Sequence, residues 1–251
     1  MKVKVAGQPY DEGAYAAEIR AAVDDRVRHQ ADAGIDILTD GEQSKPGFSA
    51  YVRERLAGFE PRPGLKLPFF PVEVGAFPEY YEEYFKHAML GGAVAPSAPM
   101  VCVGPVSYRG EAELKRDIAN LKAATARVPH HAVFMPAVAP SGVGRNEYYK
   151  TEEEFFHAVG AALATEYKAI VDAGFLLQID DPFLTDIFVD PELDDAGKRR
   201  RADMYIETVN EGLKGLPADR VRYHTCYGIN EGPRIHEAAL ADVGGYMLKV
   251  N

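Results

Sequence analysis

The stretch EYKAIVDAGFLLQIDDPFL, residues 166–184, joins the end of an amphipathic helix to a short, strongly apolar segment. The helical pattern begins near residue 151 and stops at Gly174, a residue type that favours helix C-termini. FLLQIDDP (175–182) then has the character of a buried strand that ends in two aspartates. A helix leading into a buried strand with polar residues at its carboxyl end is typical of α/β proteins with a parallel sheet.

The same helix-to-strand step recurs along the chain. An amphipathic helix is expected over 11–33, with Gly34 as its stop, and IDILT (35–39) follows it as a strand. Strands and helices continue to alternate in the rest of the sequence, with strands expected at 101–107, 133–140 and 221–228, and helices at 110–127, 196–214 and from Leu240 to Val250.

Polar residues follow each of the five expected strands, which distinguishes between two parallel-sheet architectures. A doubly wound sheet would gather functional groups at one switch point, and no Gly-rich phosphate loop follows the first strand. Polar carboxyl ends on every strand favour the (β/α)8 TIM-barrel type. We predict one such domain over residues 1–251. It is incomplete, because a closed barrel needs eight strands.

The segment 58–99 interrupts this alternation. It is rich in proline, glycine and aromatic residues and is too long for a plain loop in a compact domain. Two interpretations stay open: an insertion or lid beside the functional face, or an aromatic flap that only packs.

Composition excludes several classes of protein. The chain is 47% hydrophobic and 26% charged, as expected of a soluble globular protein, and no apolar run approaches the roughly 18 residues of a membrane span. Its net charge of −10 argues against a nucleic-acid partner or an anionic membrane. Two cysteines and no export signal indicate a reducing, cytoplasmic location.

His224 and Cys226 are the first candidate functional residues. Residues i and i+2 of a strand share one face, so both side chains could reach one ion, and zinc suits imidazole with thiolate ligands. Two ligands do not complete a zinc site, and a packed histidine beside a buried cysteine is the alternative. Asp180 and Asp181 are the second candidate, because adjacent buried carboxylates need a cation or donors. Only one of them should face a barrel mouth.

Glu42 is the third candidate, in the loop that follows the strand 35–39. Gly41 permits a sharp turn that could bring Glu42 to the same mouth as Asp180. Lys45 could instead neutralise Glu42, which would make the pair structural. His236 is open to three interpretations: a metal ligand, a substrate contact or a surface histidine.

Four segments together resemble a known family. They are GIDILTDGEQSKPGFSAYVRERLAGFE (34–60), NEYYKTEEEFF (146–156), EYKAIVDAGFLLQIDDPFL (166–184) and HTCYG (224–228). They look like the catalytic half of the cobalamin-independent methionine synthases. The resemblance is strongest to the stand-alone methionine synthase II relatives, which include thiol alkyltransferases such as epoxyalkane:coenzyme M transferase. It covers nearly the whole chain in the right order.

The resemblance implies a zinc-dependent methyltransferase, in which Zn²⁺ activates a small-molecule thiol of homocysteine type. The methyl donor would be of the 5-methyltetrahydrofolate type. His224 and Cys226 match the first two zinc ligands of the family. Asp180 and Glu42 match the residues that hold the homocysteine amino group, and His236 is a further candidate substrate contact. Cys102 matches no family ligand and is expected in the core.

The departures from the family pattern concern completeness. The remaining family ligands, a glutamate and a cysteine, come from strands seven and eight, so this sequence corresponds to about strands 2–6 with their helices. We therefore expect either a truncated barrel, or one completed by another chain or by self-association. Two alternative functions remain: a zinc-dependent alkyl transferase with another substrate, and an inactive scaffold or binding subunit.

Overall fold

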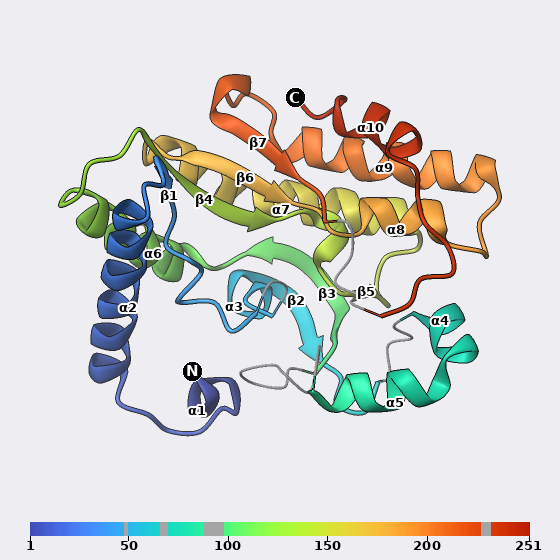
Figure 1. Cartoon of the computed structure of the whole chain (residues 1–251), viewed down its shortest axis with the longest axis horizontal. Coiled ribbons are helices and arrows are strands. Elements are labelled where there is room, and N and C mark those ends of the chain that lie inside the picture. The colour runs from blue at the N-terminus through green and yellow to red at the C-terminus, as the bar shows by residue number, and fades with distance from the viewer. Residues whose placement is uncertain (48–49, 66–69, 88–97, 227–231) are drawn as a thin grey trace.

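The computed structural model describes residues 1–47, 50–65, 70–87, 98–226 and 232–251. In chain order its elements (Figure 1) are α1 (Lys2–Val5), α2 (Glu12–Asp32), β1 (Ile37–Leu38), α3 (Val52–Arg55), β2 (Leu56–Pro61), α4 (Pro71–Ala76), α5 (Pro78–His87), β3 (Met100–Tyr108), α6 (Glu111–Thr125), β4 (Ala132–Val138), the 3-10 helix η1 (Pro140–Gly142), β5 (Arg145–Asn146), α7 (Glu152–Asp172), β6 (Leu176–Asp180), α8 (Leu184–Val189), α9 (Asp195–Gly212), the 3-10 helix η2 (Ala218–Arg220), β7 (Val221–His224) and α10 (Leu240–Met247).

Four strands form a parallel sheet in the order β1-β4-β6-β7. Val138 of β4 lies opposite Asp180 of β6, and Asp180 lies opposite His224 of β7. Their carboxyl ends therefore meet at one edge of the sheet. The predicted α/β class is confirmed, and the described strands leave the sheet open, with β1 and β7 at its two ends. Of the strand expected at 221–228, residues 227 and 228 lie outside the described residues.

The strand expected at 101–107 takes a different place from the one predicted. It forms β3, which pairs antiparallel with β2 and parallel with β5 in a second sheet, while β1 pairs directly with β4. Alternation of apolar residues marks a strand but not its partner. The partner β2 was missed, since its residues were assigned largely to the 58–99 segment. Gly58, at the irregularity in this pairing, has φ +89°, and a Cβ there would meet the Pro105 carbonyl.

The helices α2, α6, α7, α9 and α10 lie close to the ranges expected from the sequence, whereas the shorter helices α1, α3, α4, α5 and α8 were not predicted. The side chains of Asp11, Thr151 and Asp194 accept hydrogen bonds from backbone N–H groups in the first turns of α2, α7 and α9. Gly34 and Gly174 follow α2 and α7 with φ of +80° and +90°, as C-terminal glycines do. Helix α7 contacts β3, β4, β6 and α9, so it packs against both sheets (Figure 1). No helix among the described residues is both long enough and apolar enough to span a bilayer.

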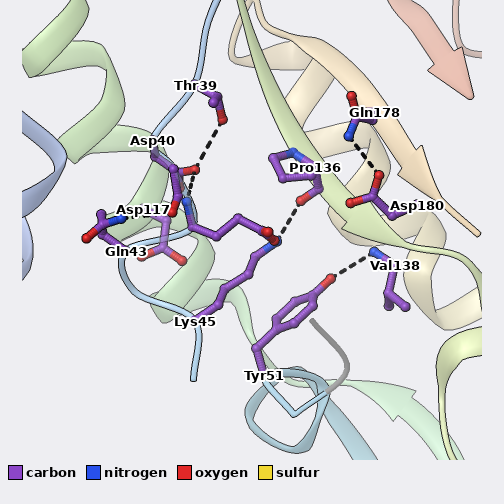
Figure 2. Close-up of polar contacts among 12 residues, drawn as sticks. Thr39, Asp40, Gln43, Lys45, Tyr51, Asp117, Pro136, Val138, Gln178 and Asp180 are labelled. Carbon is purple, nitrogen blue, oxygen red and sulfur yellow. Dashed lines mark hydrogen bonds and ion pairs between the residues drawn. The ribbon is translucent and has the colours of Figure 1, made fainter. Parts of the chain in front are cut away.

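Side chains satisfy the edge of β4 beyond the point where β1 ends. β1 pairs with β4 only at Ala132 and Val133. Farther along, Lys45 Nζ donates to Pro136 O (2.8 Å) and Val138 N donates to the Tyr51 hydroxyl (3.0 Å) (Figure 2). The Tyr167 hydroxyl donates to Val138 O (2.7 Å). Backbone groups that a neighbouring strand would otherwise bond are thus paired inside the protein.

The described part of the 58–99 segment is a strand followed by two short helices, and residues 66–69 and 88–97 lie outside the description. Tyr81 of α5 is buried, and its hydroxyl donates to Pro233 O at 3.1 Å. Glu73 of α4 accepts from Ile235 N at 3.3 Å. The two helices therefore contact the chain that follows β7 (Figure 1). The role of the 58–99 segment as an insertion or lid stays a prediction.

Tyr51→Phe tests the side-chain bonding of β4. The change leaves the buried Val138 N–H without its acceptor, so we expect the free energy of unfolding to fall by about 1–3 kcal/mol. Urea denaturation measures it. Tyr148→Phe, whose ring is half exposed, is the matched control and should change stability by less than about 0.5 kcal/mol. Equal effects of the two substitutions would contradict the assignment.

Candidate functional site

The two aspartates at the end of β6 bond to different partners. Asp180 Oδ1 lies 2.9 Å from His224 Nδ1 and accepts from Gln178 Nε2 at 2.7 Å. Asp181 instead accepts from the Ser141 hydroxyl (2.7 Å) and the Tyr223 hydroxyl (2.9 Å). Strand alternation thus separates the carboxylates, and Asp180 is the one beside His224.

His224 is oriented by Asp180 across the β6–β7 register. Its side chain is 54% exposed, whereas that of Asp180 is 10% exposed. The contact occupies Nδ1 and leaves Nε2 as the ring nitrogen that can ligate a metal. A carboxylate behind a histidine fixes the tautomer and raises the basicity of metal-ligating imidazoles. His224 therefore fits the chemistry of a zinc ligand.

Gln178 and Arg222 extend this arrangement along the sheet. Arg222 Nε donates to Gln178 Oε1 at 2.7 Å, and the Arg222 guanidinium lies 3.7 Å from the centroid of the Phe134 ring. The chain of contacts Arg222–Gln178–Asp180–His224 was missed from the sequence. Alternation could have signalled it, because Gln178 and Arg222 each lie two residues before Asp180 and His224 on the same faces.

Cys226 lies just beyond β7, in a segment held by two hydroxyls. Thr225 Oγ1 donates to Asp181 O and Thr185 Oγ1 donates to Cys226 O, both at 2.8 Å. The cysteine is partly buried and forms no disulfide. Over the described residues, no group of three or more His, Cys, Asp or Glu side chains is arranged to hold a metal ion. His224 and Cys226 are thus at most part of a ligand set.

Glu42 pairs with Lys45, the alternative that the sequence left open. Glu42 Oε1 lies 3.0 Å from Lys45 Nζ, and the Glu42 N–H donates to Asp40 Oδ1 at 2.9 Å. Burial raises the pKa of Asp40, although Lys45 and the Glu42 N–H oppose the shift. Lys45 also bonds Pro136 of β4, whose Val138 lies opposite Asp180 (Figure 2). Glu42 and Asp180 are thus both tied to the carboxyl-terminal part of β4.

His236 and Cys102 lie apart from these groups. His236 is exposed between β7 and α10, and its neighbours Pro233 and Ile235 contact α5 and α4. Cys102 is buried in β3, where burial raises the pKa of its thiol, as a core position requires. The structure therefore brings together His224 and Asp180 and links Glu42 to the same region through β4. Within the part of the chain that the structure describes, no contact joins His236 to them.

Comparisons with known proteins find similarity to methionine synthases. No family model matches the chain. Methionine synthase from Sulfolobus acidocaldarius is 26% identical over 203 residues, covering 80% of this chain and 49% of that protein, and its Sulfurisphaera tokodaii counterpart is 27% identical over 206 residues, covering 78% and 47%. The fold matches the B12-independent methionine synthase from Shewanella sp. W3-18-1 in complex with selenomethionine, with TM-score 0.65, 20% identity, and coverage of 87% of this chain and 54% of that one. The chain is therefore similar in sequence to methionine synthases over about 80% of its own length, and similar in fold to a B12-independent methionine synthase over 87% of it.

The match to methionine synthases concerns part of their length. The chain spans about half of the curated methionine synthases it matches. The likeness therefore concerns the fold of this chain, in which Asp180, His224 and Cys226 lie in the region where parallel strands end.

Tyr223→Phe tests the electrostatics behind this region. Burial raises the pKa of Asp181, and the hydrogen bonds from Ser141 and Tyr223 oppose that shift. The folded state therefore binds the Asp181 proton more readily than the unfolded state, and the contribution of Asp181 to stability falls as pH rises above about 4.

Removing the Tyr223 hydroxyl raises the Asp181 pKa further. We expect the variant to lose about 1.5–3 kcal/mol of unfolding free energy at pH 7 and less at pH 4. Urea denaturation between pH 4 and 7 measures the difference, with Tyr148→Phe as control. A deficit that does not change with pH would contradict the assignment.

Proposed function

We propose that the chain carries the thiol-activating part of a zinc-dependent methyltransferase, which transfers a methyl group from a 5-methyltetrahydrofolate-type donor to a homocysteine-type thiol. The observation that carries this proposal is His224, held through Nδ1 by Asp180, with Cys226 two residues farther on. The names of the relatives support it, and so does selenomethionine in the related structure, an amino acid with a methylated side-chain selenium.

His224 and Cys226 would hold the zinc ion. When bound, zinc supplies the Lewis acidity that keeps a thiol available as thiolate at neutral pH. The protein's own contribution is orientation: Asp180 fixes the His224 ring, Gln178 donates to Asp180, and Arg222 donates to Gln178.

Glu42 and Asp180 would receive the ammonium group of the thiol substrate. Both carboxylates are linked to the carboxyl-terminal part of β4. Glu42 is already paired with Lys45, and Asp180 with His224. A substrate ammonium adds to these pairs in a partly enclosed site, where charge interactions are stronger than in water. His236 stays a proposed substrate contact.

The ligand set requires further groups, since zinc takes three or four protein ligands. We propose that these come from outside the described residues, on a completing chain or a second copy. The two open ends of the parallel sheet, β1 and β7, support this proposal. If a second copy completes the site, zinc affinity should rise with protein concentration, together with a dimer in analytical ultracentrifugation.

Cys226→Ser tests the metal assignment. Loss of a direct ligand should weaken zinc binding by more than about 100-fold, whereas Asp180→Asn, which removes only the group behind His224, should weaken it about 10–100-fold. Competition with a chromophoric chelator measures both affinities. Cys102→Ala, which changes the buried cysteine, should retain zinc. Full zinc retention by Cys226→Ser would refute the ligand assignment, and wild-type protein without zinc or turnover would leave the scaffold function.

The methyl donor and acceptor are tested by turnover of the zinc-loaded protein. We expect methionine to form from 5-methyltetrahydrofolate and homocysteine, detected by mass spectrometry, and Cys226→Ser to abolish it. Transfer only from other alkyl donors, or only to another thiol, would identify the protein as a zinc-dependent alkyl transferase with a different substrate.

A further inference from the structure

Lys45 is a buried cation whose contacts come from three directions. Its side chain is 6% exposed, and its Nζ bonds Glu42 Oε1 (3.0 Å) and Pro136 O (2.8 Å). The same atom lies 4.2 Å from the centroid of the Tyr51 ring (Figure 2). Because a buried charge is costly without a counterion, this environment ties the Lys45 ammonium to the Glu42 carboxylate.

The groups that contact the Lys45 ammonium are themselves held in place. Pro136 belongs to β4, inside the parallel sheet. The Tyr51 hydroxyl accepts from Val138 N and lies 3.4 Å from Glu166 Oε1, so the ring beneath Lys45 is bonded to the same strand and to helix α7. Because Lys45 is bonded both to β4 and to Glu42, it holds the loop residue Glu42 at a fixed position relative to that strand.

Glu42 needs such support because its backbone is strained. Its φ of +54° lies in the left-handed region, which a side chain disfavours, and of the other described non-glycine residues only Phe70 shares a positive φ. Strain of this kind costs about 1–3 kcal/mol and persists only where the surroundings enforce it. Here the Glu42 N–H bonds Asp40 Oδ1, and the Glu42 carboxylate bonds Lys45.

We propose that Lys45 is a positioning residue, which anchors one carboxylate oxygen of Glu42 to β4 so that the other oxygen receives the ammonium group of an amino-acid ligand. The Glu42 side chain is 39% exposed, which leaves it accessible to such a ligand. The proposal rests on the proposed function only for the nature of the ligand. The opposite role, in which Lys45 competes with the ligand for Glu42, predicts an effect of opposite sign.

Lys45→Met tests the proposal, because methionine keeps an unbranched side chain and removes the charge. The probes are L-methionine and 4-(methylthio)butanoate, which lacks the amino group, and calorimetry gives their affinities. We expect the variant to bind L-methionine about 10-fold more weakly, the equivalent of about 1.4 kcal/mol, and to bind the analogue unchanged. Lys168→Met, which removes an exposed Lys168–Asp172 pair, is the matched control. Unchanged or tighter L-methionine binding by Lys45→Met would overturn the proposal.

A double-mutant cycle shows whether Lys45 acts through Glu42. Glu42→Gln alone should weaken L-methionine binding, and adding Lys45→Met should cause little further loss, because the two substitutions remove one interaction. Additive losses would overturn the proposal.

A measurement without any ligand separates this proposal from the proposed function. Hydrogen exchange of the Glu42 amide, which bonds Asp40, should be at least about 10-fold faster in Lys45→Met than in wild-type protein or Lys168→Met. If wild-type protein does not bind L-methionine, the ligand proposed for the site is wrong, and exchange alone decides the positioning role. Unchanged exchange would overturn that role whatever the ligand.

Discussion

The side chains of Lys45, Tyr51 and Tyr167 hold the backbone of β4 at Pro136 and Val138, where β1 has already ended. Because of these bonds, β1 can end after two paired residues without leaving the backbone N–H and C=O groups of β4 unpaired. The loop released in this way carries Glu42 and leads, through α3, to the second sheet. Both the open arrangement of the fold and the position of one candidate substrate contact therefore depend on them.

Glu166 connects this edge to the second sheet. It is buried in α7, and it accepts from the hydroxyl of Tyr108 in β3 at 2.8 Å and lies 3.4 Å from that of Tyr51. Arg55 lies in the same charged group: burial alone would lower its pKa, but Glu166 and Asp117 raise it overall. Buried charges that are paired in this way are sensitive to the loss of any partner, which makes the junction between the two sheets specific in geometry.

The sequence was sufficient for features that depend on local pattern. Helix stops at Gly34 and Gly174, the α/β class, and the separation of Asp180 from Asp181 follow from glycine conformation and strand periodicity. The sequence was insufficient to identify strand-pairing and hydrogen-bond partners that lie far apart along the chain. Alternation in β3 could not show pairing with β2 rather than with the parallel sheet, and nothing local marks Tyr51 as the acceptor for Val138 N–H. The pairing of His224 with Asp180 lies between these cases, because it needs both the alternation and the β6–β7 register.

The charged groups of the candidate site are paired before any ligand arrives. His224 lies against Asp180 and Lys45 against Glu42, while Asp181 is held by neutral hydroxyls on the other face of β6. Oriented groups of this kind need little rearrangement when a charged ligand binds, so more of the interaction energy is available for recognition. Different elements fix the two groups. Adjacent parallel strands fix the orientation of the His224 imidazole, whereas a strained loop bonded to β4 fixes the position of Glu42. The binding of a ligand that contacts both His224 and Glu42 would therefore depend on the register of the sheet at one end and on the Lys45 contact at the other.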